Sequence, residues 1–176
     1  KKMAERPLIL AMANPVPEIM PELAKEVRPD AILATGRSDY PNQVNNVLCF
    51  PFLFRGALDV GATEINDEMK IACVKAISRL AKAGTSDVVT SAYAGETLRY
   101  GAEYLIPKPF DPRLIVEIAS AVAQAAMDSG VATRPVASMQ EYRDRLNRQV
   151  YRSGMVMRPV YERARNSGCR IAFAEG

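Results

Sequence analysis

The sequence predicts an α/β fold built on part of a Rossmann-like, doubly wound parallel sheet with large helices. Residues 7–13 (PLILAMA) and 31–35 (AILAT) are short apolar runs that end at Asn-Pro and at Gly, as buried strands often do. Residues 18–26 between them can form a short helix, and this order predicts a parallel crossover. In such sheets, ligands bind beyond the carboxyl ends of the strands.

Two helices are expected directly after the second strand. Residues 44–60 are apolar with Pro51 among them, so a buried helix there should begin or kink at that proline. Thr63 is a suitable N-cap for a helix over residues 64–83, with acidic residues in its first turn. Gly84 would end that helix.

The middle of the chain carries weaker patterns. Residues 88–92 can form a short strand or an extended stretch, and residues 96–101 one turn of helix. Residues 106–112 hold three prolines, which predict an extended connector. The alanine-rich helix that follows should cover residues 114–127 and end before Gly130.

The composition changes after this helix. A charged helical stretch is expected over residues 139–152 and another over 156–166, and CRIAFA at 169–174 predicts a buried strand. A strand requires a neighbour, so we expect this one to open a second α/β domain. The expected division is residues 1–130 for the first domain, 131–138 for a linker and 139–176 for the start of the second.

The composition disfavours several classes of protein. The hydrophobic share of 48% and charged share of 24% are ordinary for a globular domain, so disorder is not expected. A net charge of +3, with acids and bases interleaved, is too weak an indication of nucleic-acid binding. The sequence shows neither a signal-peptide pattern nor an apolar run of membrane-spanning length, so we expect a cytoplasmic protein.

The chain contains no histidine, which excludes histidine-activated nucleophiles and histidine-ligated metal within it. Any catalysis by these residues must use carboxylate, lysine, tyrosine, arginine or amide side chains. Cys49, Cys73 and Cys169 lie far apart in the sequence. We expect them to be small buried hydrophobic residues in a reducing compartment.

Three short segments place polar groups at a strand end or a helix start. Asn14 either forms a local Asx turn or faces a ligand. In TGRSDY, Gly36 allows close approach of the backbone to a ligand and Arg37 could bind a carboxylate or phosphate, whereas the alternative is a capped surface loop. The amides of residues 42–46 (NQVNN) either cap the helix or bind a small polar ligand.

Three runs resemble bacterial malic enzymes: LILAMANPVPEI, the gapless AILATGRSDYPNQVNNVLCFPFLFRGALDVGATEINDEMKIACVKAI, and GAEYLIPKPFDPRL. The most distinctive part is residues 34–59. After the expected linker, MQEYRDRLNRQVYRSGMVMRPVYERARNSGCRIAFAEG resembles the start of the phosphotransacetylase-like domain that follows malic enzyme in the long, fused bacterial form. The resemblance therefore covers both parts of the expected division.

This resemblance implies an enzyme that converts malate to pyruvate and carbon dioxide while reducing NADP, or NAD. It also implies a Mg²⁺ or Mn²⁺ ion, bound by residues outside this chain, that acts as a Lewis acid. Asn14 matches an asparagine near the nicotinamide and malate, and Asn45 one that contacts malate or the nicotinamide carboxamide. The expected substrate- and cofactor-binding residues are Asn14, Gly36, Arg37, Ser38, Asn45 and Asn46.

The family's general acid, general base, metal ligands and glycine-rich dinucleotide loop have no counterpart in this sequence. We therefore assign no catalytic residue here and expect these 176 residues alone to be inactive. The resemblance also implies a homo-oligomer that contacts the rest of the malic enzyme polypeptide, with possible regulation by acetyl-CoA. The alternative function is a regulatory or oligomerisation module that links a dehydrogenase to an acetyl-CoA-sensing domain. A different Rossmann dehydrogenase would require the NQVNN run to be coincidental.

Overall fold

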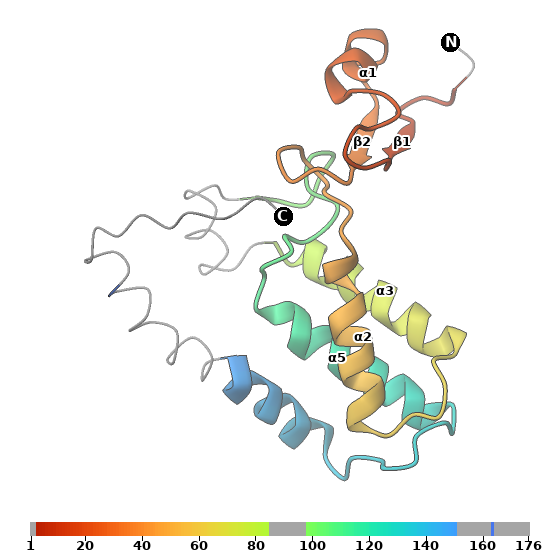
Figure 1. The fold of residues 1–176 in the computed structure, drawn as a ribbon, viewed down its shortest axis with the longest axis vertical. Helices are drawn as coiled ribbons and strands as arrows, with labels where there is room; N and C mark the ends of the chain where they lie inside the picture. The colour runs from red at the N-terminus through yellow and green to blue at the C-terminus, as the bar shows by residue number, and fades with distance from the viewer. Residues whose placement is uncertain (1–2, 85–97, 151–162, 164–176) are drawn as a thin grey trace, which may run out of the picture.

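The computed structural model describes residues 3–84, 98–150 and 163. Figure 1 shows a small β-α-β unit at one end of these residues and a group of long helices at the other. The predicted strand over residues 88–92 and the stretches over 156–166 (apart from Arg163) and 169–174 lie outside the described residues. No helix within the described ranges is both long and apolar enough to cross a membrane.

The β-α-β unit forms as the sequence predicts. It consists of β1 (Leu8–Ala11), α1 (Pro21–Val27) and β2 (Ile32–Thr35). The two strands are parallel, with Leu8 opposite Ile32 and Ala11 opposite Thr35. Proline suits the start of α1 because its missing N–H would have no helical partner there. The predicted α/β class with a parallel sheet is confirmed.

The helical part contains the short 3-10 helix η1 (Asn46–Leu48) and the helices α2 (Phe50–Asp59), α3 (Asp67–Lys82) and α5 (Arg113–Asp128). In Figure 1, α5 runs alongside both α2 and α3. Their shared core is filled by fully buried side chains, including Met69, Leu114, Ile118 and Val122. The apolar faces of these helices therefore pack against one another.

Of the two expected helices, one begins at its proline as predicted and the other has a different cap. The single helix expected over residues 44–60 is divided into η1 and α2, and Pro51 lies in the first turn of α2. Thr63 is wrong as the N-cap of α3, which begins at Asp67 and is capped by Asn66. The Asn66 side chain accepts a hydrogen bond from the Met69 amide at 3.1 Å. The Thr63 amide donates instead to the Val131 carbonyl at 3.0 Å, which keeps this segment extended.

The connector before α5 agrees with the sequence in part. Residues 98–101 contain no helix, so the turn expected over 96–101 is wrong for its described part. Gly101 and Tyr104 exchange two backbone hydrogen bonds there, which holds a tight bend in place of a helix. Residues 106–112 contain neither helix nor strand, and α5 ends before Gly130, where φ is +75°.

Residues 139–150 are helical and pack against the same core. Tyr142 and Leu146 are buried, and the Tyr142 hydroxyl donates to the Asp59 carboxylate at 2.7 Å. Arg143 forms an ion pair with Glu117 of α5 at 3.0 Å. The described part of this helix is thus joined to α2 and α5, while the domain division at residues 131–138 stays a prediction.

Candidate functional site

The carboxyl ends of the two strands bring two of the predicted polar segments together. Ala11 and Thr35 are paired in register, so β1 and β2 end at the same level. Gly36 lies against the backbone that follows β1, because a Cβ built at Gly36 would be 3.8 Å from the Met12 carbonyl oxygen. The segment that leads to Asn14 and the segment that begins with Gly36 are therefore neighbours, as predicted for a ligand-binding edge.

The chain after β2 forms a closed loop. The Val44 amide donates to the Thr35 carbonyl at 2.8 Å, and Thr35 and Gln43 form a parallel bridge. The Gln43 side chain also donates to the Gly36 carbonyl at 3.3 Å. Because the loop returns to its own start, it places Asn45 beside the end of β2. Asn45 therefore lies near the residues that begin the loop, starting with Gly36.

Asn42, the first of the NQVNN amides, fixes this loop through three hydrogen bonds to the backbone. Its side chain is only 4% exposed, and its φ of +53° is one that asparagine tolerates better than most residues. Its Nδ2 donates to the carbonyls of Leu33 at 2.9 Å and Ala102 at 2.7 Å, and its Oδ1 accepts from the Leu105 amide at 2.7 Å. In the sequence, Asn42 stands out only as one of the NQVNN amides and by the Pro41-Asn42 pair, which is typical of a turn.

Asn45 carries one of the two functions that the sequence left open for the NQVNN amides. Its Oδ1 caps η1 by accepting a hydrogen bond from the Val47 amide at 3.0 Å. Its Nδ2 makes no hydrogen bond to the part of the chain that the structure describes, so this half-buried amide still offers a donor. Asn46, the next residue, is exposed. Capping and ligand binding are therefore compatible at Asn45.

The other predicted residues are placed less distinctively. Asn14 is exposed, and its peptide bond to Pro15 is cis. The carboxylate of Glu18, not the Asn14 side chain, accepts a hydrogen bond from the Ala13 amide, at 3.1 Å, and this bond lowers the pKa of Glu18. An Asx turn would need the Asn14 side chain to accept from the Val16 amide, and this side chain makes no hydrogen bond to the residues that the structure describes, so no such turn forms there. Ser38 is exposed in the loop after β2.

Arg37 is already paired within that loop. Its guanidinium makes two hydrogen bonds to the Asp39 carboxylate, at 2.9 and 2.6 Å, and lies over the Tyr40 ring at 5.2 Å. These hydrogen bonds lower the pKa of Asp39 and raise that of Arg37. An anionic ligand would have to compete with Asp39, so Arg37 suits the capped-loop interpretation at least as well as the ligand-binding one.

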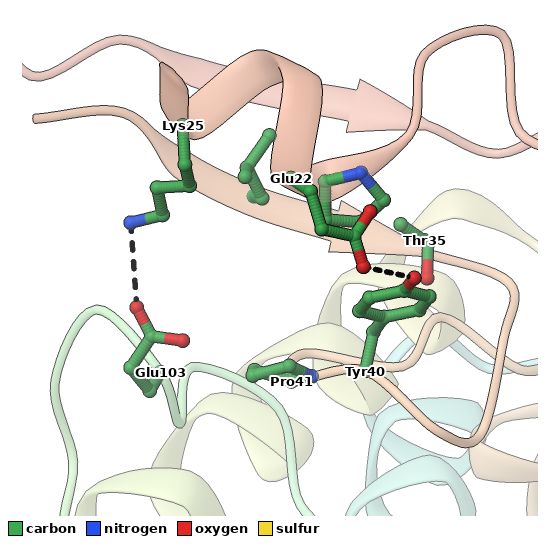
Figure 2. A pocket seen from close by; sticks show the side chains of 8 residues that line it. Glu22, Lys25, Thr35, Tyr40, Pro41 and Glu103 are labelled. Carbon is green, nitrogen blue, oxygen red and sulfur yellow. Dashed lines mark hydrogen bonds and ion pairs between the residues drawn. The ribbon is translucent and has the colours of Figure 1, made fainter. Parts of the chain in front are cut away.

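A pocket of about 310 Å³ lies beside this loop, between α1, β2 and the segment around Glu103. Figure 2 shows Glu22 facing Tyr40 and Lys25 facing Glu103 across its opening. The Tyr40 hydroxyl donates to Glu22 at 2.5 Å, which lowers the pKa of Glu22 and raises that of Tyr40. Lys25 and Glu103 pair at 3.5 Å. None of the six predicted binding residues lines this pocket, so it is distinct from the predicted site.

The described residues contain no group of three or more histidine, cysteine, aspartate or glutamate side chains arranged to hold a metal ion. Several carboxylates near the helices are instead engaged by arginines: Asp59 pairs with Arg55 and Asp111 with Arg113, each at 2.6 Å. These pairs stabilise helix ends and a helix start rather than forming a cation site.

Comparison with known proteins decides the family. Residues 1–91, more than half of the chain, match the family described as malic enzyme, NAD binding domain. This chain belongs to the malic enzyme family. The NADP-dependent malic enzymes of Salmonella typhimurium and Escherichia coli are each 65% identical to it across 100% of its length. The chain spans 23% of each of those relatives, so it corresponds to about a quarter of a malic enzyme polypeptide.

Solved malic enzyme structures agree with the fold. The malic enzyme from Pyrococcus horikoshii is 40% identical with a TM-score of 0.73, covering 95% of this chain and 34% of that one. The malic enzyme of Entamoeba histolytica is 33% identical with a TM-score of 0.72, covering 90% of this chain and 30% of that one. The resemblance drawn from the sequence is confirmed for malic enzyme, whereas the fused phosphotransacetylase-like domain stays a prediction.

Proposed function

We propose that this chain forms one wall of the malate and NADP site of a malic enzyme, which converts malate to pyruvate and carbon dioxide. The observation that carries the proposal is the position of Asn45: the residue before it, Val44, is hydrogen-bonded to Thr35 at the end of β2, and the Asn45 Nδ2 is available as a donor. Relatives named as NADP-dependent malic enzymes support the activity. Since those relatives are longer, we assign the activity to a polypeptide of their length.

The residues at this edge suit a nicotinamide and a dicarboxylate. The Asn45 amide can donate to a carboxylate or carboxamide oxygen without placing a charge beside the reacting carbon. Gly36 leaves room for close approach, because no atom lies nearer than 3.8 Å to its Cβ position. Asn14, Asn46 and the Arg37–Ser38 turn complete the proposed wall. When bound, the nicotinamide cofactor would accept the hydride of malate. Relatives are named as NADP-dependent or as NAD-dependent malic enzymes.

The remaining groups are assigned to the rest of the polypeptide. A Mg²⁺ or Mn²⁺ ion would polarise the malate oxygens, and the described residues offer no cluster suited to hold it. On the resemblance to malic enzymes, we place the metal ligands, the general acid and the general base outside this chain. Its own contribution is to position and orient substrate and cofactor.

Apolar side chains on the surface support a place within a larger protein. Leu8 and Leu10 on β1 are 53% and 57% exposed, and Phe50 and Leu58 on α2 are exposed as well. Because each such side chain is already partly buried, covering its exposed part would contribute about 1–2 kcal/mol. We propose that further strands and helices of the malic enzyme polypeptide cover these surfaces.

The division of the site is tested by comparing two polypeptides. The 176-residue chain alone should not reduce NADP or NAD with malate in the presence of Mg²⁺ or Mn²⁺. The same chain within a polypeptide of its relatives' length should do so, as followed by the absorbance of the reduced cofactor. Malate oxidation by the purified 176-residue chain would contradict the proposed division.

A regulatory or oligomerisation role is the second candidate function. It is favoured by a polar hollow of about 320 Å³ beside residues 139–150, which Arg145 and Arg148 line together with Glu141. Within this proposal, residues 139–176 begin a phosphotransacetylase-like domain after the 131–138 linker. The protein is then a cytoplasmic homo-oligomer that responds to acetyl-CoA.

The double variant Arg145→Ala, Arg148→Ala separates the two roles. A changed oligomer size or acetyl-CoA response with turnover preserved would support the module. Unchanged size and unchanged response would reject this role for residues 139–150. Both readouts apply to the longer polypeptide, by size-exclusion chromatography and by malate turnover with and without acetyl-CoA.

A further inference from the structure

Two cysteines that are distant in the sequence meet between α2 and α3. The Sγ atoms of Cys49 and Cys73 are 3.2 Å apart, although 24 residues separate them in the chain. Cys49 precedes the first residue of α2, and Cys73 lies in the middle of α3. The sequence suggested isolated buried thiols; the packing of η1 and α2 against α3 corrects this by making them a pair.

The two thiols differ in their access to solvent. Cys49 is partly exposed and lines an open hollow of about 410 Å³ together with Asn46, Phe50 and Leu53. Cys73 is 0% exposed. Burial raises the pKa of the Cys73 thiol to about 12, and the contact with Cys49 adds to this rise. A dissolved oxidant therefore reaches Cys49 first. Cys73 is shielded from solvent and stays protonated.

We propose that Cys49 and Cys73 form an intramolecular disulfide site that is oxidised by a small hydroperoxide. In the first step the Cys49 thiolate attacks a peroxide oxygen and the O–O bond breaks. An alcohol or water leaves, and Cys49 becomes a sulfenic acid. In the second step the Cys73 sulfur attacks the Cys49 sulfur, the S–O bond breaks, and water leaves with the thiol proton. Overall the two thiols lose two electrons and two protons, and the hydroperoxide is reduced.

The geometry favours the second step. A disulfide bond is about 2.05 Å long, so the two sulfurs must approach by only about 1.1 Å. Cys49 lies at the junction of η1 and α2 rather than inside a helix, and a junction can shift more easily than a helix interior. Holding the two groups in contact makes the attack intramolecular. The resulting bond would tie the start of α2, three residues after Asn46, to α3.

Peptide mapping of the 176-residue chain tests this site. After mild treatment with hydrogen peroxide, alkylation of free thiols and digestion with trypsin, we expect residues 38–55 to be linked to residues 71–75. The pair should be lighter than its two reduced peptides by two hydrogens, about 2 Da, and a thiol reductant should separate it. The linked peptides also distinguish this pair from any that includes Cys169, which lies outside the described residues.

Single replacements provide the controls. Cys169→Ser should leave the link unchanged, whereas Cys49→Ser and Cys73→Ser should each abolish it. In Cys73→Ser, Cys49 should stop at the sulfenic acid, which dimedone traps. The proposal is overturned if both thiols of the wild-type chain remain free after excess peroxide. It is equally overturned if Cys49 proceeds to the sulfinic acid without forming the link, or if the link joins two chains.

Discussion

The Leu105 amide donates a hydrogen bond to the Asn42 side chain at 2.7 Å, across 63 residues of sequence. The same side chain donates to Leu33 of β2 and to Ala102, so one buried amide joins the strand, the loop after it and the connector before α5. The loop that presents Asn45 is therefore positioned by a residue that need not touch any ligand.

Replacing Asn42 by alanine should destabilise the chain by about 2–4 kcal/mol, because three backbone groups, one buried and two partly buried, lose their partner. Asn42→Gly is the matched variant, since it loses the same hydrogen bonds but suits the φ of +53°. Glycine should thus be the less damaging of the two. Chemical denaturation of both variants gives the free energies. Wild-type stability in either would show that the Asn42 bonds are not needed.

Asp30 should give the chain an acid-sensitive contribution to stability. Its carboxylate accepts hydrogen bonds from the Arg28 guanidinium and from the Arg6 amide, each at 2.8 Å, and these lower its pKa well below the usual range. Because the folded pKa is depressed, this stabilisation is fully present above the unfolded value of about 3.9 and is lost as pH falls through the folded value.

The variant Asp30→Asn isolates that contribution. Its Tm should lie below that of the wild type at neutral pH, and the difference should shrink as the solution is made more acidic than the ordinary aspartate pKa. The effect is expected to be small, since the pair is partly exposed to solvent. A Tm difference that stays constant with pH would show that the ionised Asp30 carboxylate does not provide the pH-dependent stability.

Gly56 lets α2 lie close against α5. A Cβ at this position would lie 2.6 Å from the Ala119 carbonyl oxygen and 2.9 Å from the Val122 Cβ. Gly56→Ala should therefore cost about 1–3 kcal/mol in the free energy of unfolding, despite the better helix propensity of alanine. Gly101→Ala is the control, because its Cβ position meets nothing closer than 3.9 Å. Equal stability of the two variants would contradict the close packing.

Leu146 tests whether residues 139–150 belong to the core formed by α2, α3 and α5. It is fully buried, so Leu146→Ala should destabilise the chain by about 2–5 kcal/mol. Asn147→Ala, at the exposed neighbouring position, should change stability by no more than about 0.5 kcal/mol. Thermal unfolding measures both. A small effect at Leu146 would instead mean that residues 139–150 do not share a core with α2, α3 and α5.

The sequence predicted those elements whose patterns are complete within a short segment. β1 and β2 lie within continuous apolar runs that end at Asn14-Pro15 and at Gly36, so both strands and their parallel arrangement were predictable. The placement of Asn14 and of the turn that begins at Gly36 beyond the strand ends followed from the same pattern, whereas Asn45 was expected only at a helix start. The start of α5 directly after the prolines of the connector was predictable for the same reason.

Features that depend on distant partners could not be predicted. Thr63 and Asn66 are both favoured caps, and the choice of Asn66 depends on the bond between Thr63 and Val131, 68 residues away. The contact between Cys49 and Cys73 likewise exists only after α2 and α3 have packed. Single-chain spacing contains no information about such pairs.

The central claim is that the Asn45 amide donates to malate or to the nicotinamide. Asn45→Ser tests it within a polypeptide of the relatives' length. Serine retains an oxygen that can accept from the Val47 amide and so preserve the cap of η1, but it lacks the amide donor. A loss of activity would therefore not be explained by a lost cap.

The decisive measurement is kcat/KM for malate with NADP. We expect Asn45→Ser to lower it at least tenfold, about 1.4 kcal/mol of transition-state stabilisation, with an unchanged Tm. Asn147→Ala, which removes an exposed amide elsewhere, should leave kcat/KM unchanged. A wild-type kcat/KM in Asn45→Ser would contradict the assignment of Asn45 to the substrate and cofactor wall.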